Sequence, residues 1–428
     1  MINNNKSQII THLNHSEFFN QTCPDYDNSR RDESGTISFK LKKIIFRIIG
    51  NKKKWIPPAE KIDGSKMKRV IIFRNDGIGD YIVSTPVIRW LRQALPKVEI
   101  DVLTSFRNDA IVKQDPYVCL TYPIHHKRIF HKSVLKLYKL RKNNYDVIIC
   151  LDYTKTTNSA ILARIIAPNA EKITVLHPAR KDIYGLVFNR QTKINVGSTQ
   201  WSRNMLNFVT ENIKPEKDLP VNECNPYVFI HEKDYLYIKP LVDNYHLKYS
   251  PNPEKILSQV DFSNDKKNTG ENKYCILNIS AFKEGHSLTI DLAVDTCKCL
   301  AEKYNSLIVF VTGVKEDFSK VEQITKKINK SNCVELKLNL SEFIAFLAGA
   351  EFVITPDTAT VHLAAAAGVP VIGIYTSTDS ARTWYPYDVP FSIVLSANNK
   401  NVDSIETGEI LEATEILVNW LNKGVGYG

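Results

Sequence analysis

FVITPDTATVHLAAAAGVPVIGIYTSTD, residues 352–379, predicts a strand, a polar loop, a helix and a second strand in immediate succession. The apolar run 352–354 is expected to form the first strand and Val371–Tyr375 the second. The helix expected between them, Ala359–Ala367, consists mostly of small residues, and Gly368 ends it. Such a βαβ unit is typical of a parallel α/β sheet.

The polar residues of this stretch lie where an α/β protein binds ligands. In open parallel sheets the ligand binds outside the carboxyl ends of the strands, and the N-terminus of the next helix offers N–H groups to a phosphate. Asp357, Thr358 and His362 border this point, and Thr376 follows the second strand. We therefore expect a nucleotide or sugar-phosphate site. The structural alternative is that Asp357 only caps the helix and that His362 packs inside the protein.

Composition indicates an ordinary soluble protein. The 428 residues are 43% hydrophobic and 24% charged, and this length predicts two or three domains. No apolar run approaches the roughly 20 residues that a membrane span needs, and the first residues lack the pattern of a secretory signal. We therefore expect a cytoplasmic protein. The eight cysteines include no C-x-x-C pair, and we interpret them as reduced core residues.

The net charge of +10 is concentrated at the start of the chain. Residues 1–66 hold 12 Lys/Arg and 7 Asp/Glu, so their charge of +5 is half of the excess. A basic chain can bind nucleic acid, but no nucleic-acid-binding motif appears, and we expect no such partner. An anionic membrane surface or a phosphorylated substrate explains the charge instead.

Residues 1–66 are predicted to be a basic, partly disordered leader. Residues 1–36 are polar and lack periodicity, so we expect them to be disordered or loosely attached. Residues 37–55 contain seven Lys/Arg and no acid, and as a helix they would be basic and amphipathic. Two interpretations stay open: the helix lies peripherally on an anionic membrane, or it packs on the domain that follows. We predict that a chain starting at Met67 folds without the leader.

Two domains of alternating strands and helices are expected after the leader. The first, 67–250, begins with a buried strand at 68–73, the loop 74–80 and a helix from Pro86 capped by Ser84 or Thr85. Residues 251–273, rich in Ser, Pro, Asn and Lys, are expected to link it to the second domain, 274–428. A periodic helix at Thr407–Asn422 is expected to close the second domain. Both domains are therefore predicted to be α/β with a doubly wound, mostly parallel sheet.

Three motifs in this order resemble those of glycosyltransferase family 9, the heptosyltransferases of lipopolysaccharide assembly. They are RVIIFRNDGIGDYIVSTPVIRWLRQALP at 69–96, ILNISAFKEGHS at 276–287 and the stretch at 352–379. The resemblance implies a GT-B fold, in which two Rossmann-like domains face each other across a cleft and bind the acceptor and the nucleotide-sugar donor. It also implies inverting, metal-independent transfer, typically of heptose from ADP-heptose to a lipopolysaccharide or related lipid-linked acceptor. Such an enzyme is expected at the cytoplasmic face of the inner membrane.

The resemblance assigns roles to residues of this chain. Asp80 matches the proposed general base, and Lys283 matches the lysine on the donor diphosphate. Glu316 or Asp317 falls where the family keeps an acid for the nucleoside ribose. The other residues expected at the donor are Ser280, Asp357, Thr358, Ala359, His362 and Thr376, and those expected in the loop near the acceptor are Asn75, Gly77 and Gly79.

The chain departs from the family pattern at three donor-site positions. Ala359 stands where the family usually has a glycine after Asp-Ser/Thr. Thr376 also replaces a glycine, and His286 stands where a tryptophan is common.

The residues suit the same chemistry without the family. Inverting transfer needs a base for the acceptor hydroxyl, which Asp80 can supply, and positive charge for the leaving diphosphate, which Lys283 can supply. The alternative is that Asp80 is only a helix cap and Lys283 a solvated lysine. A metal-dependent transferase would usually show Asp-x-Asp near the donor. The only such triplet, at 25–27, lies in the leader, so no metal or cofactor is expected.

Two other functions stay open on the same fold. One is a catalytically silent nucleotide- or glycan-binding protein, and the other is a nucleotide-sugar epimerase of the GT-B type. A dinucleotide-dependent oxidoreductase is disfavoured, because residues 75–80 lack the third glycine of the G-x-G-x-x-G fingerprint.

Overall fold

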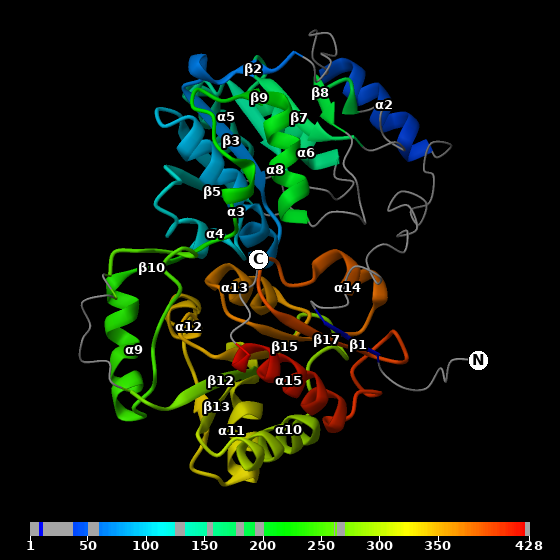
Figure 1. Ribbon diagram of the computed structural model, residues 1–428. Coiled ribbons are helices and arrows are strands. Elements are labelled where there is room, and N and C mark those ends of the chain that lie inside the picture. The colour runs from blue at the N-terminus through cyan, green and yellow to red at the C-terminus, as the bar shows by residue number, and fades with distance from the viewer. Residues whose placement is uncertain are drawn as a thin grey trace. The chain divides into compact units, whose positions relative to one another are not determined.

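The chain forms two compact α/β units, shown as a computed structural model in Figure 1. The first unit is Thr22–Asn225, and the second is Pro226–Gly428 together with Met1–Gln21. The structure describes residues 8–11, 37–49, 60–124, 133–151, 157–176, 184–192, 201–260, 262 and 270–423.

The first unit is built on a parallel sheet with the strand order β5-β4-β3-β6-β7-β8. β3 lies in the middle of this sheet and is buried on both faces, which explains its continuous apolar run. The strands are β3 (Arg69–Arg74), β4 (Glu99–Ser105), β5 (Leu120–Ile124), β6 (Val147–Cys150), β7 (Glu171–Val175) and β8 (Arg190–Thr192), and a separate small sheet pairs β2 (Ile62–Asp63) with β9 (Ile213–Lys214).

Helices connect the strands of the first unit and cover its sheet. They are α2 (Ile37–Ile49), α3 (Ile78–Ala94), α4 (Asp109–Val112), α5 (Ser133–Leu140), α6 (Thr157–Ile166) and α8 (Trp201–Asn212), with 3₁₀ turns η1 (Gly64–Lys66), η2 (Arg141–Asn143) and η4 (Val221–Glu223). α3 begins at Ile78, earlier than the helix predicted from Pro86. The hydroxyls of Ser84 and Thr85 are not caps, because they donate to the carbonyls of Tyr81 and Ile82 within the helix.

The second unit is built on a sheet with the order β14-β13-β12-β15-β16-β17-β1, parallel except for β1. The strands are β12 (Lys273–Asn278), β13 (Leu307–Thr312), β14 (Cys333–Leu336), β15 (Phe352–Pro356), β16 (Val371–Tyr375), β17 (Phe391–Leu395) and β1 (Gln8–Thr11). The helices are α9 (Glu232–Asn244), α10 (Ile290–Lys303), α11 (Phe318–Ile328), α12 (Leu340–Leu347), α13 (Ala359–Ala367), α14 (Thr378–Trp384) and α15 (Thr407–Asn422), with the 3₁₀ turn η6 (Lys315–Asp317). The βαβ unit β15-α13-β16 and the closing helix α15 confirm the predicted elements.

Part of the leader is an integral strand, contrary to the prediction that residues 1–36 are disordered or loosely attached. β1 pairs antiparallel with β17, and Ile10 within it is buried. An apolar side chain placed against the sheet edge explains why this short polar-flanked segment is ordered. The remaining residues of 1–36 lie outside the described part of the chain.

The predicted leader helix exists as α2, and it packs on the first unit. Phe46 of α2 is completely buried in a core cluster that includes Ala163 and Ile166 of α6. Both α2 and β1 therefore contact a folded unit, and whether residues 1–66 are dispensable for folding stays a prediction that truncation at Met67 tests. None of the helices in the described part of the chain is long and apolar enough to cross a membrane.

The division between the units lies before the linker predicted at 251–273. It falls after Asn225, and residues 226–260 join the second unit. β10 (Val228–Ile230) pairs with β11 (Ile256–Ser258), and α9 contacts α12. Residues 226–260 are rich in polar side chains, but they belong to the second unit because apolar side chains among them, such as Ile238 of α9, are buried.

Candidate donor and acceptor sites

The second unit gathers polar side chains where its strand order reverses. β12 has β13 on one side and β15 on the other, so the chain runs outward to β14 and then returns to β15. In a doubly wound sheet, the crevice outside the carboxyl ends of two such strands is the usual ligand site. The loops after β12 and β15 therefore frame the candidate donor site.

Asn278, the last residue of β12, connects the elements that frame this site. Its buried side-chain amide donates to Thr355 Oγ1 in β15 at 2.9 Å and to Thr360 Oγ1 in α13 at 3.3 Å. One amide thereby fixes the ends of both strands and the helix that follows. The sequence analysis missed Asn278, although a lone amide within the apolar run ILNIS was a visible signal.

Ser280 and Asp317, both expected at the donor, contact each other. Ser280 Oγ donates to Asp317 Oδ2 at 2.6 Å, and a Cβ on Gly313 would lie 2.5 Å from that hydroxyl oxygen. Burial raises the pKa of Asp317, but hydrogen bonds from Lys320 and Ser280 outweigh this effect and hold the pKa below its ordinary value. Asp317 therefore fastens two loops together. The exposed Glu316 is the acid of this pair that a ligand can reach.

Asp357 follows β15 and is the acid nearest to the reversal point of the sheet. It accepts a short hydrogen bond from the hydroxyl of Ser380 in α14. Burial raises the pKa of Asp357, and this hydroxyl and the nearby charges of Lys283 and His286 partly offset the rise. The carboxylate therefore shares one electrostatic environment with two residues of the loop after β12.

Thr358 and Ala359 begin α13 beside this carboxylate. Thr358 is the N-cap residue, and its Oγ1 accepts a hydrogen bond from Thr360 N at 3.3 Å. The first N–H groups of a helix lack partners within the helix, and this end carries partial positive charge. Together with the exposed ammonium of Lys283, the helix end can stabilise a diphosphate.

His286 and Thr376 join the loops after β12 and β16. Thr376 Oγ1 lies 2.9 Å from His286 Nδ1, and the threonine is buried. Burial, followed by the charge of Lys283, lowers the pKa of His286 and so favours the neutral form of its imidazole. The sequence analysis placed Thr376 at the donor and noticed His286 only as a departure from the family pattern.

His362, also expected at the donor, is a buried residue of α13. Its ring lies edge-to-face against Trp384 of α14, with the ring centroids 5.8 Å apart at an angle of 70°. His362 thus contributes to the packing of α13 against α14.

The first unit carries the predicted acceptor loop at the carboxyl end of β3, which lies between β4 and β6. Asp80 is the third residue of α3, and its Oδ2 accepts a hydrogen bond from Gly77 N at 3.0 Å. A Cβ on Gly77 would lie 2.8 Å from the same oxygen, which explains the glycine. Asp80 therefore caps α3, and its carboxylate remains partly exposed.

Arg74, the last residue of β3, organises this loop and was missed from the sequence. Its guanidinium is buried, with Nε donating to the Asp80 carbonyl at 2.7 Å and Nη1 to the Leu151 carbonyl at 2.5 Å. Nη1 lies 3.1 Å from Asp76 Oδ2, and Nη2 lies 3.5 Å from Asp80 Oδ1. A buried cation between two carboxylates fixes both of them. An arginine followed by two acids in RNDGIGD was the available signal.

The remaining predicted loop residues are held by the same framework. Asn75 is buried, and Gly79 lies half-buried in the first turn of α3. Asn108 Nδ2 donates to the Arg74 carbonyl at 2.8 Å, and Ser105 Oγ donates to the Asp76 carbonyl at 2.6 Å. The segment after β4 therefore supports the acceptor loop.

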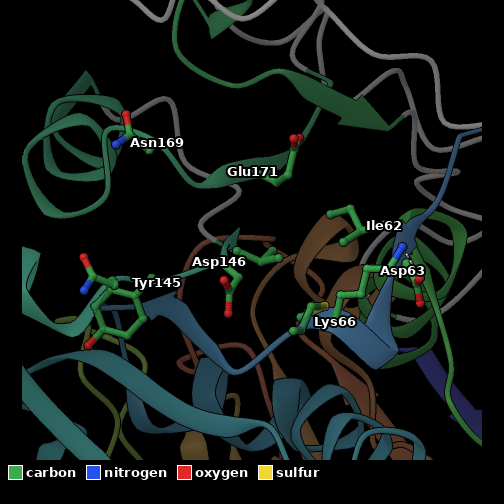
Figure 2. A pocket seen from close by; sticks show the side chains of 10 residues that line it. Ile62, Asp63, Lys66, Tyr145, Asp146, Asn169 and Glu171 are labelled. Carbon is green, nitrogen blue, oxygen red and sulfur yellow. Dashed lines mark ion pairs between the residues drawn. The ribbon is translucent and has the colours of Figure 1, made fainter.

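A cavity of about 460 Å³ lies at the other edge of the first sheet, where β6 and β7 begin (Figure 2). Its acids already have partners. Asp146 accepts from the backbone N–H groups of Lys68 and Arg69, and Glu171 pairs with Arg190. None of the predicted site residues lines this cavity.

Metal-ligating residues do not cluster in the described part of the chain. No three His, Cys, Asp or Glu side chains there are grouped as a metal site requires. Among the described residues, Cys119, Cys224, Cys275, Cys297, Cys299 and Cys333 are not in disulfides.

Comparison with known proteins gives the same family as the motifs. The family model described as "Glycosyltransferase family 9 (heptosyltransferase)" matches residues 298–413. Lipopolysaccharide heptosyltransferase 1 of Campylobacter coli is 24% identical over 75% of this chain and 87% of its own. Lipopolysaccharide heptosyltransferase 3 of Escherichia coli K12 is 24% identical over 79% of this chain and 95% of its own.

Solved structures share the fold. The glycosyl transferase family 9 structure from Veillonella parvula has a TM-score of 0.62 at 14% identity and covers 82% of this chain and 97% of its own. E. coli heptosyltransferase WaaC with ADP has a TM-score of 0.59 at 16% identity, covering 82% and 98%.

The fold is that of the GT-B class of glycosyltransferases, as the sequence predicted. The chain is similar to glycosyltransferase family 9 over residues 298–413 and to lipopolysaccharide heptosyltransferases over about three quarters of its length. The matched range 298–413 includes Glu316, Asp357 and Thr376, whereas Asp80 and Lys283 lie outside it.

Proposed function

We propose that this chain is an inverting, metal-independent glycosyltransferase that moves heptose from ADP-heptose to a lipopolysaccharide or related glycan acceptor. In the reaction, an acceptor hydroxyl oxygen attacks the anomeric carbon of the donor sugar. The bond from this carbon to the β-phosphate oxygen breaks, and its electron pair leaves with ADP. A base takes the hydroxyl proton. One displacement at the anomeric carbon inverts its configuration.

The observation that carries the proposal is the grouping at the carboxyl ends of β12 and β15. Lys283, the N-terminus of α13 and Asp357 meet at the reversal point of a doubly wound sheet. Two positive elements suit the charge that develops on the departing diphosphate. Glu316 is proposed to bind the ribose, and the hydroxyl-rich ends of the strands are proposed to bind the sugar.

Asp80 is proposed to be the general base. A carboxylate in the loop of the first unit is a chemically suitable proton acceptor, and its geometry is fixed by Gly77 and Arg74. Arg74 Nη2 lies 3.5 Å from Asp80 Oδ1 and helps to hold the carboxylate in one position. Asp80 therefore both caps α3 and remains available for proton transfer.

Charge stabilisation by Lys283 and the helix end supports transfer without a metal ion. We propose that these groups replace the divalent cation that other glycosyltransferases place on the diphosphate. Activity that survives a chelator such as EDTA is the expected result. Loss of activity on chelation and its return with Mg²⁺ would contradict this part of the proposal.

The decisive experiment incubates the purified full chain with ADP-heptose and a heptose-deficient lipopolysaccharide acceptor. We expect a glycosylated product, release of ADP, and an anomeric configuration opposite to that of the donor by NMR. Parallel assays with other nucleotide sugars test whether ADP-heptose is preferred. Retained configuration would exclude a single displacement at the anomeric carbon.

The same assay separates the alternative functions. A silent binding protein would be stabilised by a nucleotide sugar in thermal unfolding, through mass action, yet release no nucleotide diphosphate with any acceptor. An epimerase would change the donor sugar without an acceptor. Acceptor-dependent ADP release is the result that distinguishes transfer from both.

A place on the cytoplasmic face of the inner membrane belongs to the proposal, because a lipid-linked acceptor would be presented there. The basic range 37–55 is proposed to contribute this peripheral contact. No nucleic acid is needed for the proposed reaction.

A further inference from the structure

α2 lies on the outside of the first unit (Figure 1), and it exposes a continuous apolar stripe. The stripe residues occupy positions i, i+3, i+4 and i+7, so they lie on one face of the helix. They and their exposed fractions are Leu41 (58%), Ile44 (53%), Ile45 (40%) and Ile48 (77%). Large apolar residues exposed together mark an interaction surface more often than scattered ones do.

The stripe is free because α2 is held by another face. Phe46 points into the core of the first unit and is completely buried, and α2 contacts α6. Each residue of an α-helix is rotated by about 100° from the one before it. Phe46 therefore lies about 100° around the helix from Ile45 and about 160° from Ile48. Packing on the unit therefore leaves the apolar stripe uncovered by the described residues.

The charges around the stripe indicate what covers it. Lys40 and Arg47 are exposed and border the stripe next to Ile44, since they are four residues before and three after it. The helix sequence ISFKLKKIIFRII contains four basic residues and no acid. An apolar face bordered by cations complements a bilayer with anionic headgroups.

Length fixes the orientation of the helix. Thirteen residues extend about 20 Å, less than the roughly 30 Å of a bilayer core. We infer that α2 lies in the plane of an anionic membrane, with Leu41, Ile44, Ile45 and Ile48 among the acyl chains and Phe46 fastening the helix to the first unit. This inference rests on the proposed peripheral membrane contact of residues 37–55 and names the side chains that make it, and vesicle binding tests it separately from glycosyl transfer.

A second exposed apolar pair provides a matched control. Leu236 and Tyr237 lie on α9 of the second unit and are also largely exposed. Their helix, EKDYLYIKPLVDN, carries both acids and bases. Variants in the two helices therefore show whether exposed apolar residues bind membranes only when the charged residues of their helix are all basic.

The test is flotation of the full chain with vesicles of phosphatidylcholine, with and without phosphatidylglycerol. We expect binding to the anionic vesicles that weakens as salt is added. The double variant Leu41→Glu/Ile48→Glu should reduce the bound fraction about tenfold or more, whereas Leu236→Glu should leave it unchanged. Lys40→Glu/Arg47→Glu should also abolish the preference for anionic vesicles.

Three results would overturn the inference. One is parental flotation of the Leu41→Glu/Ile48→Glu variant with unchanged thermal unfolding. Another is equal binding to neutral and anionic vesicles. The third is a dimer of the parent in light scattering that becomes a monomer in the same variant, because a second copy of the chain would then cover the stripe. The rate of transfer to a short soluble acceptor should be the same in the parent, in the Leu41→Glu/Ile48→Glu variant and in the Leu236→Glu variant.

Discussion

Thr376 Oγ1 lies 2.9 Å from Nδ1 of His286, so a side-chain hydrogen bond joins the loops that follow β16 and β12. Both residues differ from the glycine and tryptophan that the family pattern has at these positions. The two departures therefore form one contact beside Asp357, whose charge also acts on His286. A contact of this kind is suited to shape the space offered to the donor sugar.

We predict that His286 and Thr376 act as a pair. In a double-mutant cycle of His286→Ala and Thr376→Val, the free energies of unfolding should be coupled by about 0.5–1.5 kcal/mol. Thr376→Gly should enlarge the site and change the ratio of kcat/KM between two nucleotide sugars by about tenfold. Additive stabilities together with an unchanged donor preference would show that the pair does not select the donor.

The pH dependence of stability provides a second prediction for His286. Its pKa lies below the ordinary 6.5 when folded, so below pH 6.5 the unfolded chain binds more protons than the folded chain. The contribution of the neutral imidazole to stability is therefore fully present above pH 6.5 and is lost as the pH falls from there through the lower folded pKa. His286→Gln should flatten this part of the curve of unfolding free energy against pH. An unchanged curve would contradict the lowered pKa.

For Asp80 we predict a loss of turnover without a loss of structure. The amide oxygen of Asn can still accept the hydrogen bond from Gly77 N, but Asn cannot accept the proton, so Asp80→Asn should slow transfer about 10²–10⁴-fold. Donor affinity and melting temperature should stay near the parent. Asp76→Asn is the matched control, since it also removes a carboxylate beside Arg74 but leaves the cap of α3 intact. Full turnover in Asp80→Asn would leave Asp80 as a cap and direct attention to His286 or His362 as the base.

Lys283 should act on the leaving group and not on stability. Its side chain is exposed, so Lys283→Met removes little packing, whereas a bound diphosphate loses a charge-assisted contact of about 1.5–3 kcal/mol. We expect weaker donor binding in calorimetry and slower transfer, with the same melting temperature. Lys326→Met is the control, because Lys326 is exposed in the last turn of α11 and pairs with Glu322. Equal donor affinity in the Lys283 variant and the parent would refute this role.

Both ordered parts of the leader should contribute to stability. Phe46→Ala should destabilise the first unit by about 3–5 kcal/mol and Ile10→Ala the second by about 2–5 kcal/mol, because each side chain is buried. Hydrogen exchange read out by peptide should localise each effect to its own unit. Ile48→Ala, at a strongly exposed position of α2, should cost little. A chain starting at Met67 that melts like the parent would show that neither contact matters.

Local sequence patterns predicted several elements of the second unit correctly. The strand, cap, helix and strand of 352–379 appear as β15, α13 and β16, because apolar periodicity, Thr358 and Gly368 act within a few residues of one another. By contrast, the start of α3 was misplaced. Pro86 looked like a first helical residue, yet the Asp80 cap and the hydroxyls of Ser84 and Thr85 extend the helix toward the N-terminus.

In the leader, the sequence could not predict contacts with residues that are distant along the chain. Nothing in Gln8–Thr11 predicts a partner, since strand pairing with Phe391–Leu395 joins residues almost the whole chain apart. The helix of residues 37–49 was visible in its pattern, but which face is buried was not. Phe46 is covered and Ile48 exposed because of the packing against α6, which no local pattern encodes.

What the sequence determined by itself is the class of fold, the resemblance to a family and the residue types of the candidate site, since motifs and hydrophobic periodicity are local and ordered along the chain. Tertiary structure alone decided which side chains meet: Arg74 with Asp80, Ser280 with Asp317, and His286 with Thr376. Arg74 and Asp80 belong to one loop, whereas the other two pairs come from separate loops brought together by parallel strands, and hydrogen bonds need atoms within about 3 Å. Only the folded sheet sets distances of that kind.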